Sequence, residues 1–183
     1  LLVNVVIFAG SAAVAFRIRR IWGSAGRGAR AAWLAAAVVA VAAQMLALTA
    51  AEPGGLSNLA RRVLDPSFTS YHTVARRVED PAEFLRRYHE LQREFPVHGP
   101  SQPPGRILFF RAINEWASEG GRTSALLALG ERFGGVPKGP PGTTDGQRAG
   151  AVAAGLLLVA IGALAIVPLT VIAGGRCEPE RSE

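Results

Sequence analysis

Two acidic residues in the central part of the sequence could act as a general base. Asp65 and Asp80 each stand directly before a proline, downstream of a long apolar segment. A carboxylate close to apolar surface and a bilayer can have a raised pKa and accept a proton from a hydroxyl group. The structural alternative is that both are helix N-caps, since aspartate followed by proline is a common helix start. We take Asp65 as the first candidate for a catalytic base and Asp80 as the second.

Basic residues that follow these acids could bind a phosphate group. His98 opens a turn at 98–105 with the sequence His-Gly-Pro-Ser-Gln-Pro-Pro-Gly, in which the prolines restrict the backbone. A histidine in such a turn could donate to a phosphate oxygen or carry a proton. Arg106 and Arg111 follow at the start of the next predicted helix, whose N-terminus would also favour an anion. The structural alternatives are a turn-capping histidine and arginines that snorkel at a membrane surface.

The remaining polar rings and the cysteine do not indicate a metal site. Tyr71, His72 and Tyr88 are expected to be packing groups rather than ligands. The three histidines are too scattered for a metal-binding pair on one helix, and the chain has a single cysteine, Cys177. There is no glycine-rich nucleotide loop. We therefore expect neither a metal nor another cofactor.

Two long apolar segments indicate that the candidate residues belong to a membrane protein. From residue 28 to 51 the only polar side chains are Arg30, Gln44 and Thr49, and from 149 to 175 there is only Thr170. Because about 20 apolar residues cross a bilayer as a helix, the sequence predicts transmembrane helices at 31–51 and 148–175. Residues 1–16 are also apolar, and we expect them to be a truncated transmembrane helix. A signal peptide is the alternative, but its basic residues should precede the apolar run rather than follow it.

The arginines between the first two apolar segments predict the topology. The loop at 17–30 contains five arginines and no acid, which is typical of a cytoplasmic loop. Residues 52–147 would then form an extracytoplasmic loop, and 176–183 a cytoplasmic tail. Because these arginines account for much of the net charge of +6, we expect membrane lipids and not nucleic acid as partners. The predicted fold is an all-α membrane protein with three transmembrane helices.

The extracytoplasmic loop carries several signals of helical structure. Helices are predicted to begin at Pro66 and at Pro81. The second of these, at 81–95, places one apolar face at Phe84, Leu85, Tyr88, Leu91 and Phe95. A third helix is predicted from Pro104 to the Gly120-Gly121 break, lying along the membrane interface, and a fourth at 123–133. The proline- and glycine-rich stretch at 134–147 is predicted to be a flexible linker.

Residues 70–116 resemble the first outer loop of a known class of membrane enzymes. The segment at 80–88 and the turn at 98–105 are similar to those of bacterial polytopic glycosyltransferases of the GT-C superfold, which include the dolichyl-phosphate-mannose protein mannosyltransferase-like group. In that family a Pro-Pro turn opens a helix along the membrane, after an acidic motif. Gln102 stands where the family commonly has a histidine, and Asp65 is followed by Pro66 rather than by a second acid.

The resemblance implies inverting sugar transfer from a polyprenyl-phosphate donor to an acceptor hydroxyl on the outer face of a bacterial inner (plasma) membrane. Asp65, or Asp80, would take the proton of the acceptor. The donor phosphate would be held by residues of the turn and of the following helix: His98, Gln102, Arg106 and Arg111. Such enzymes have many more than three spans, so the resemblance also implies that the chain is the N-terminal part of a longer protein.

Two other functions are compatible with the same residues. The first is a non-catalytic membrane protein whose outer helices bind a lipid or protein partner during envelope assembly, and the missing second acid favours it. The other is a sensor, which would need a signalling module that the short tail at 176–183 does not supply. The residues define neither the sugar and its acceptor nor the oligomeric state.

Overall fold

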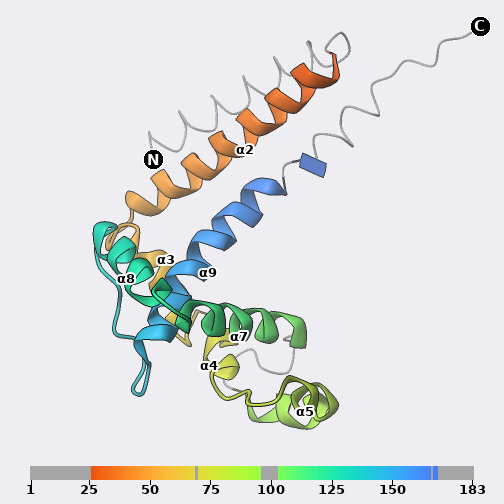
Figure 1. Cartoon of the computed structure of the whole chain (residues 1–183), viewed down its shortest axis with the longest axis vertical. Helices are drawn as coiled ribbons and strands as arrows, with labels where there is room; N and C mark the ends of the chain where they lie inside the picture. The colour runs from red at the N-terminus through yellow and green to blue at the C-terminus, as the bar shows by residue number, and fades with distance from the viewer. Residues whose placement is uncertain (1–25, 69, 96–102, 166, 169–183) are drawn as a thin grey trace, which may run out of the picture. The chain divides into compact units, whose positions relative to one another are not determined.

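The computed structural model describes residues 26–68, 70–95, 103–165, 167 and 168, and these form helices and turns without a strand (Figure 1). The all-α prediction is confirmed for this part of the chain. The chain divides into two compact units, Leu48–Leu158 and the combination of Leu1–Ala47 with Val159–Glu183. We call the first unit the helical domain. The predicted helix at 1–16, most of the basic loop at 17–30 and the tail at 176–183 lie outside the described residues.

Two of the described helices are long and apolar enough to cross a membrane. α2 (Arg27–Ala50) has 24 residues and α9 (Asp145–Leu164) has 20. α2 corresponds to the span predicted at 31–51 and begins four residues earlier. α9 corresponds to the start of the span predicted at 148–175. Within the part of the chain that the structure describes, no other helix meets the same criterion.

The helical domain is built from shorter helices around the first turns of α9. In chain order these are α3 (Ser57–Leu64), α4 (Tyr71–Ala75), α5 (Pro81–Arg86), α6 (Tyr88–Leu91), the 3-10 helix η1 (Gln92–Glu94), α7 (Pro104–Ser118) and α8 (Arg122–Arg132). In Figure 1, α3, α7 and α8 gather around the N-terminal half of α9. The core combines apolar residues of α3, α4, α5, α7 and α9 with one residue of the loop before α9: Ala60, Val63, Leu64, Val74, Ala75, Phe84, Ile107, Phe110, Val136, Ala151, Val152 and Ala154.

α9 begins at a reciprocal cap that lies slightly before the predicted span. The hydroxyl of Thr144 accepts a hydrogen bond from the backbone N–H of Gln147, and the side chain of Gln147 accepts one from the backbone N–H of Thr144. This is the capping box of a threonine followed three residues later by a glutamine. The following residues are then buried in the helical domain, with Ala149, Ala151 and Ala154 completely covered.

Glycines allow α9 to lie unusually close to its neighbours. A Cβ atom added to Gly150 would lie 2.2 Å from Oδ1 of Asn114 in α7, and one added to Gly146 would lie 2.1 Å from Oγ of Ser118. A Cβ atom added to Gly155 would lie 2.9 Å from Cβ of Leu59 in α3. Contacts this short exclude any larger residue at these positions without movement of a neighbour. The glycines therefore determine how α7 and α3 pack on α9.

α7 and α8 agree closely with the predicted helices, and α7 has a well-defined buried face. Ile107, Phe110, Asn114 and Ala117 are buried at spacings of three and four residues, whereas Trp116 is 50% exposed. α4 packs against α7, where Tyr71 stacks on Phe110 with ring centroids 6.1 Å apart. This contact and the burial of His72 confirm that Tyr71 and His72 are packing groups.

The prediction of a helix beginning at Pro66 is wrong. Residues 66–68 form a turn, and Asp65 is the C-cap of α3, with its backbone N–H donating to the carbonyl oxygen of Arg61 at 2.8 Å. The physical reason is that the residue before a proline is disfavoured in the α conformation. Asp65 is accordingly extended, at φ −80° and ψ 114°. The Asp-Pro pair therefore ends one helix rather than starting another.

The helix predicted at 81–95 is interrupted at Arg87, whose φ of −100° and ψ of 9° lie outside the helical region. The break divides the segment into α5, α6 and η1. Most of its predicted apolar face is retained, because Phe84, Tyr88 and Phe95 form an aromatic cluster with ring centroids 5.6–6.2 Å apart. Leu85 was expected on the same face but is 49% exposed. The reorientation of the chain at Arg87 brings Phe95 to Phe84 instead.

The prediction of a flexible linker at 134–147 is also wrong. The guanidinium group of Arg148 donates to the carbonyl oxygens of Val136 at 2.9 Å and Pro137 at 3.2 Å. Further along, Arg76 donates to the hydroxyl of Thr143 at 3.1 Å, and the side chain of Val136 is buried in the core. The segment is a folded loop. Its prolines and glycines prevent regular secondary structure, and two arginines instead bond to its polar groups.

The close contact at Gly150 predicts that a larger residue there destabilises the protein, whereas helix propensity alone predicts the opposite. Replacing a mid-helix glycine by alanine normally stabilises a helix. In Gly150→Ala the new methyl group would collide with Asn114, so we expect the free energy of unfolding to fall by about 1–3 kcal/mol, as for other overpacked cores. Thermal unfolding of the full chain in detergent, followed by circular dichroism, measures this.

Gly105→Ala is the matched control, since nothing lies within 4 Å of a Cβ atom built at Gly105 in α7. Its midpoint should stay unchanged or rise. If the Gly150 variant unfolds at the same temperature as the wild type, the close packing of α7 on α9 is wrong.

Candidate functional site

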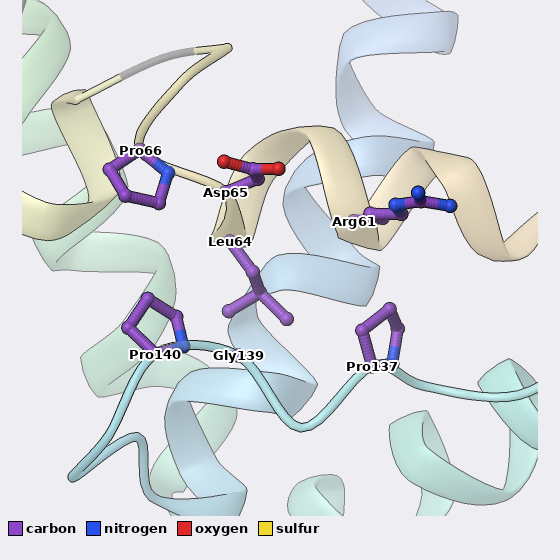
Figure 2. Close-up of a pocket in the computed structure, with 7 residues that line it drawn as sticks. All are labelled: Arg61, Leu64, Asp65, Pro66, Pro137, Gly139 and Pro140. Atoms are coloured by element: carbon purple, nitrogen blue, oxygen red, sulfur yellow. The ribbon is translucent and has the colours of Figure 1, made fainter.

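Asp65 lies at an open pocket of about 290 Å³ in the helical domain. One side is formed by the end of α3 and the two residues after it, with Arg61, Leu64, Asp65 and Pro66, and the other by the loop residues Pro137, Gly139 and Pro140. Figure 2 shows the side chain of Leu64 pointing toward this loop, with Asp65 and Arg61 on the α3 side of the space. The pocket therefore has mainly apolar walls and one charge of each sign.

Local hydrogen bonds keep the carboxylate of Asp65 ionised. Its Oδ1 atom accepts from the backbone N–H of Ser67 at 2.9 Å and from the hydroxyl of Ser67 at 2.7 Å. These bonds lower the pKa of Asp65 below its ordinary value of 3.8, and the positive charge of Arg61 acts in the same direction. The residue is partly exposed. The raised pKa expected for a carboxylate beside a bilayer is therefore not what this environment produces.

Asp80 has a structural role that accounts for its side chain. It is the N-cap of α5, where its Oδ1 atom accepts from the backbone N–H of Ala82 at 2.8 Å and Pro81 occupies the first helical turn. Glu83, in the first turn of the same helix, forms ion pairs with Arg86 and Arg87. The alternative interpretation of Asp80 as a helix cap is confirmed.

Arg111 is bound by other parts of the domain. Its Nε atom donates to the carbonyl oxygen of Val78 at 2.8 Å, and its Nη2 atom to that of Glu79 at 2.9 Å. Nη2 also lies 2.7 Å from Oε1 of Glu115 in an ion pair. The side chain is only 20% exposed. Arg111 thus fixes the segment before α5 against α7, and its Nε and Nη2 donors already have protein acceptors.

Arg106 is more accessible. Its Nη1 atom donates to the hydroxyl of Tyr71 at 2.9 Å, and its guanidinium carbon lies 5.6 Å from the centre of the Tyr71 ring. The group is exposed. An exposed guanidinium in the first turn of α7 is chemically suited to an anion.

The predicted site residues are not gathered at one place within the described residues. Of the six, only Asp65 lines the pocket. Asp80 caps α5, Arg111 of α7 bonds the segment before α5, and Arg106 contacts Tyr71. His98 and Gln102 lie outside the described residues. The sequence reasoning missed Arg61 and the loop at 137–140. The pattern at 134–147 is typical of a linker, and no helix is predicted around Arg61. The sequence therefore gives no indication that these two segments form a pocket.

A buried polar pair, His72 and Asn114, was also not anticipated as a unit. His72 is 1% exposed and Asn114 is 8% exposed, and neither ring nitrogen of His72 has a hydrogen-bond partner among the described residues. Burial, and next the positive charge of Arg76, lower the pKa of His72 to about 4, although the nearby side chain of Asn114 opposes this. The imidazole is neutral at physiological pH and contributes to the core.

No group of three or more histidine, cysteine or acidic side chains among the described residues is arranged to hold a metal ion. Comparison of the chain with protein families, with curated proteins and with solved structures finds no match. The chemistry that this geometry allows at the pocket is that of an ionised carboxylate beside a guanidinium group.

The burial of His72 predicts a pH dependence of stability. Between pH 6.5 and about 4 the unfolded chain binds a proton at this ring and the folded chain does not. The contribution of this residue to the free energy of unfolding is therefore largest above pH 6.5. It decreases as the pH falls toward 4, by about 3 kcal/mol for a pKa shift of this size. Urea unfolding of the chain in detergent, measured at a series of pH values by tryptophan fluorescence, tests this.

His72→Phe should remove most of this slope, and the exposed residue His89 provides the control, since His89→Gln should keep it. An equal slope in the wild type and the His72 variant would assign the acid sensitivity to other groups.

The contacts of Arg111 predict that lysine cannot replace it. A lysine has one ammonium group and cannot bond two carbonyl oxygens with the fork geometry of a guanidinium. We expect Arg111→Lys to lower the free energy of unfolding by about 1–3 kcal/mol, the range for lost hydrogen bonds to a charged group. Arg86→Lys on the exposed face of α5 should change it little. Thermal unfolding of both variants makes the comparison, and equal midpoints would contradict a structural role for Arg111.

Proposed function

We propose that the chain is part of a multi-pass glycosyltransferase-like protein of the bacterial plasma membrane, with three spans in this part and the helical domain on the outer face. It transfers a sugar from a polyprenyl-phosphate donor to an acceptor hydroxyl. The single observation that supports this proposal best is the ionised, partly exposed carboxylate of Asp65 at an open pocket. The two apolar helices, α2 and α9, are consistent with a membrane location.

The proposed reaction requires one base and one group that stabilises the departing phosphate. The acceptor oxygen attacks the anomeric carbon of the sugar, the bond between that carbon and the phosphate oxygen breaks, and polyprenyl phosphate leaves with the electron pair. Asp65 takes the proton of the acceptor hydroxyl as the new bond forms. The Oδ1 atom of Asp65 is held by Ser67, which would orient the carboxylate. Arg61, which lines the pocket together with Asp65, would stabilise the phosphate of the leaving group.

The second candidate is a non-catalytic membrane protein whose helical domain binds a lipid or protein partner. Specific observations favour it: Asp80 serves as a helix cap, and Arg111 is bound by three protein acceptors. Under this function the pocket at Asp65 would be a recognition surface without chemistry. The two functions differ in whether the intact protein consumes a polyprenyl-phosphate sugar.

The test of the first function is Asp65→Asn in the complete protein, reconstituted into lipid vesicles. The probe is polyprenyl phosphate carrying radiolabelled mannose or glucose, and the measurement is release of polyprenyl phosphate with appearance of labelled acceptor. We expect the variant to lose at least ~100-fold in rate, as for removal of a general base, while insertion and thermal unfolding stay unchanged.

Two further variants separate the explanations. Glu90→Gln removes an exposed carboxylate of α6 and should keep the wild-type rate. Asp80→Asn keeps a good N-cap, so a loss of turnover in this variant alone would transfer the role of base to Asp80. Wild-type protein that inserts and folds but consumes neither donor would support the non-catalytic function.

A further inference from the structure

The environment of α9 changes abruptly along its length. Of the seven residues at 149–155, all except Ala153 are buried. From Leu157 onward the larger side chains are exposed, with Leu157 at 40%, Leu158 at 45%, Ile161 at 47% and Leu164 at 54%. The exposed positions are as apolar as the buried ones. A soluble helix would normally place polar residues on its uncovered face.

The second part of α9 is covered along one narrow stripe only. Val159 and Ala163 are buried, one turn apart. Beside them, a Cβ atom added to Gly162 would lie 3.2 Å from Cε of Met45 in α2. The opposite face carries Leu157, Leu158, Ile161 and Leu164, which stay 40–54% exposed. An apolar helix face of this extent needs an apolar medium or partner.

The length of the uncharged segment identifies this medium. From Leu157 to Gly175 the sequence contains 19 residues without an acid or a base, and Arg176 follows. A helix of 19 residues would be about 28 Å long, close to the thickness of the hydrocarbon core. The span predicted from 148 would be about 42 Å long by the same rule, well above that thickness.

We propose that bilayer hydrocarbon contacts α9 from Leu157 onward, and that the preceding part, Asp145–Leu156, lies outside the hydrocarbon as the core helix of the helical domain. One continuous helix thus serves as a protein core first and as a membrane span second. The occupant of the exposed face is lipid acyl chains. The proposal requires insertion in a membrane and does not depend on the proposed sugar transfer.

Depth measurements test the proposal in the full chain. Single cysteines replace Leu158 or Leu164 in a Cys177→Ser background, each is labelled with an environment-sensitive nitrobenzoxadiazole dye, and the protein is reconstituted into phosphatidylcholine vesicles. A nitroxide is placed on the lipid either near the carbonyl group or near the chain end. The dye at 158 should lose most fluorescence with the shallow nitroxide, and the dye at 164 with the deep one. A dye at 158 quenched best by the deep nitroxide would place the boundary near 148 and overturn the proposal.

The controls use residues of similar exposure in the helical domain. Leu85→Cys is matched to Leu158, since the two leucines are 49% and 45% exposed, and its dye should be unaffected by either lipid nitroxide. Asp145→Cys should react with a membrane-impermeant maleimide, whereas Leu164→Cys should not. Fluorescence at 164 that responds to neither nitroxide, together with disulfide-linked dimers of Leu164→Cys on oxidation, would show that a second copy covers this face instead of lipid.

Discussion

The contact of α9 with α7 and α3 through glycines is the constraint on which the helical domain depends. Gly146, Gly150 and Gly155 leave room for the side chains of α7 and α3 at distances that no other residue permits. Because α9 contributes completely buried alanines between these glycines, its first turns supply backbone and methyl groups rather than large side chains. The larger apolar groups come from the helices around it, among them Leu64, Phe84 and Phe110.

Arginine side chains organise the loops of this domain. Arg111 fixes the segment before α5, Arg148 fixes the segment before α9, and Arg76 contributes a further bond to that segment. Each of Arg111 and Arg148 donates to two backbone carbonyl groups, which suits the fixed fork of a guanidinium group. Part of the basic character of the sequence is therefore used inside the fold. This explains why a positive net charge need not indicate a polyanionic partner.

The sequence predicts regular elements of this fold better than it predicts their junctions. The periodicity and flanking residues of α7 and α8 give nearly correct bounds, and the apolar run from 28 to 51 gives α2. The Asp-Pro pair at 65–66 is misleading, because the same two residues can end or begin a helix, and the choice depends on whether Ser57–Leu64 is helical. The pocket at Asp65 could not be predicted, since its far wall is a loop whose position is set by Arg148 and Arg76 through long-range bonds. His72 was correctly predicted as a packing group, but its proximity to Asn114 arises only when α4 packs on α7.

The position of Asp65 at the end of α3 has an electrostatic consequence. Helix carbonyl groups concentrate partial negative charge at the C-terminus, so a carboxylate there is repelled by the helix dipole by up to about 1 kcal/mol. Arg61 and Arg62 in the last turn have the favourable sign, and Ser67 donates two hydrogen bonds. A neutral side chain at 65 would avoid the repulsion altogether. Asp65 is thus an anion at an unfavourable end of a helix whose charged form its neighbours nevertheless stabilise, and the carboxylate remains partly exposed for chemistry or recognition.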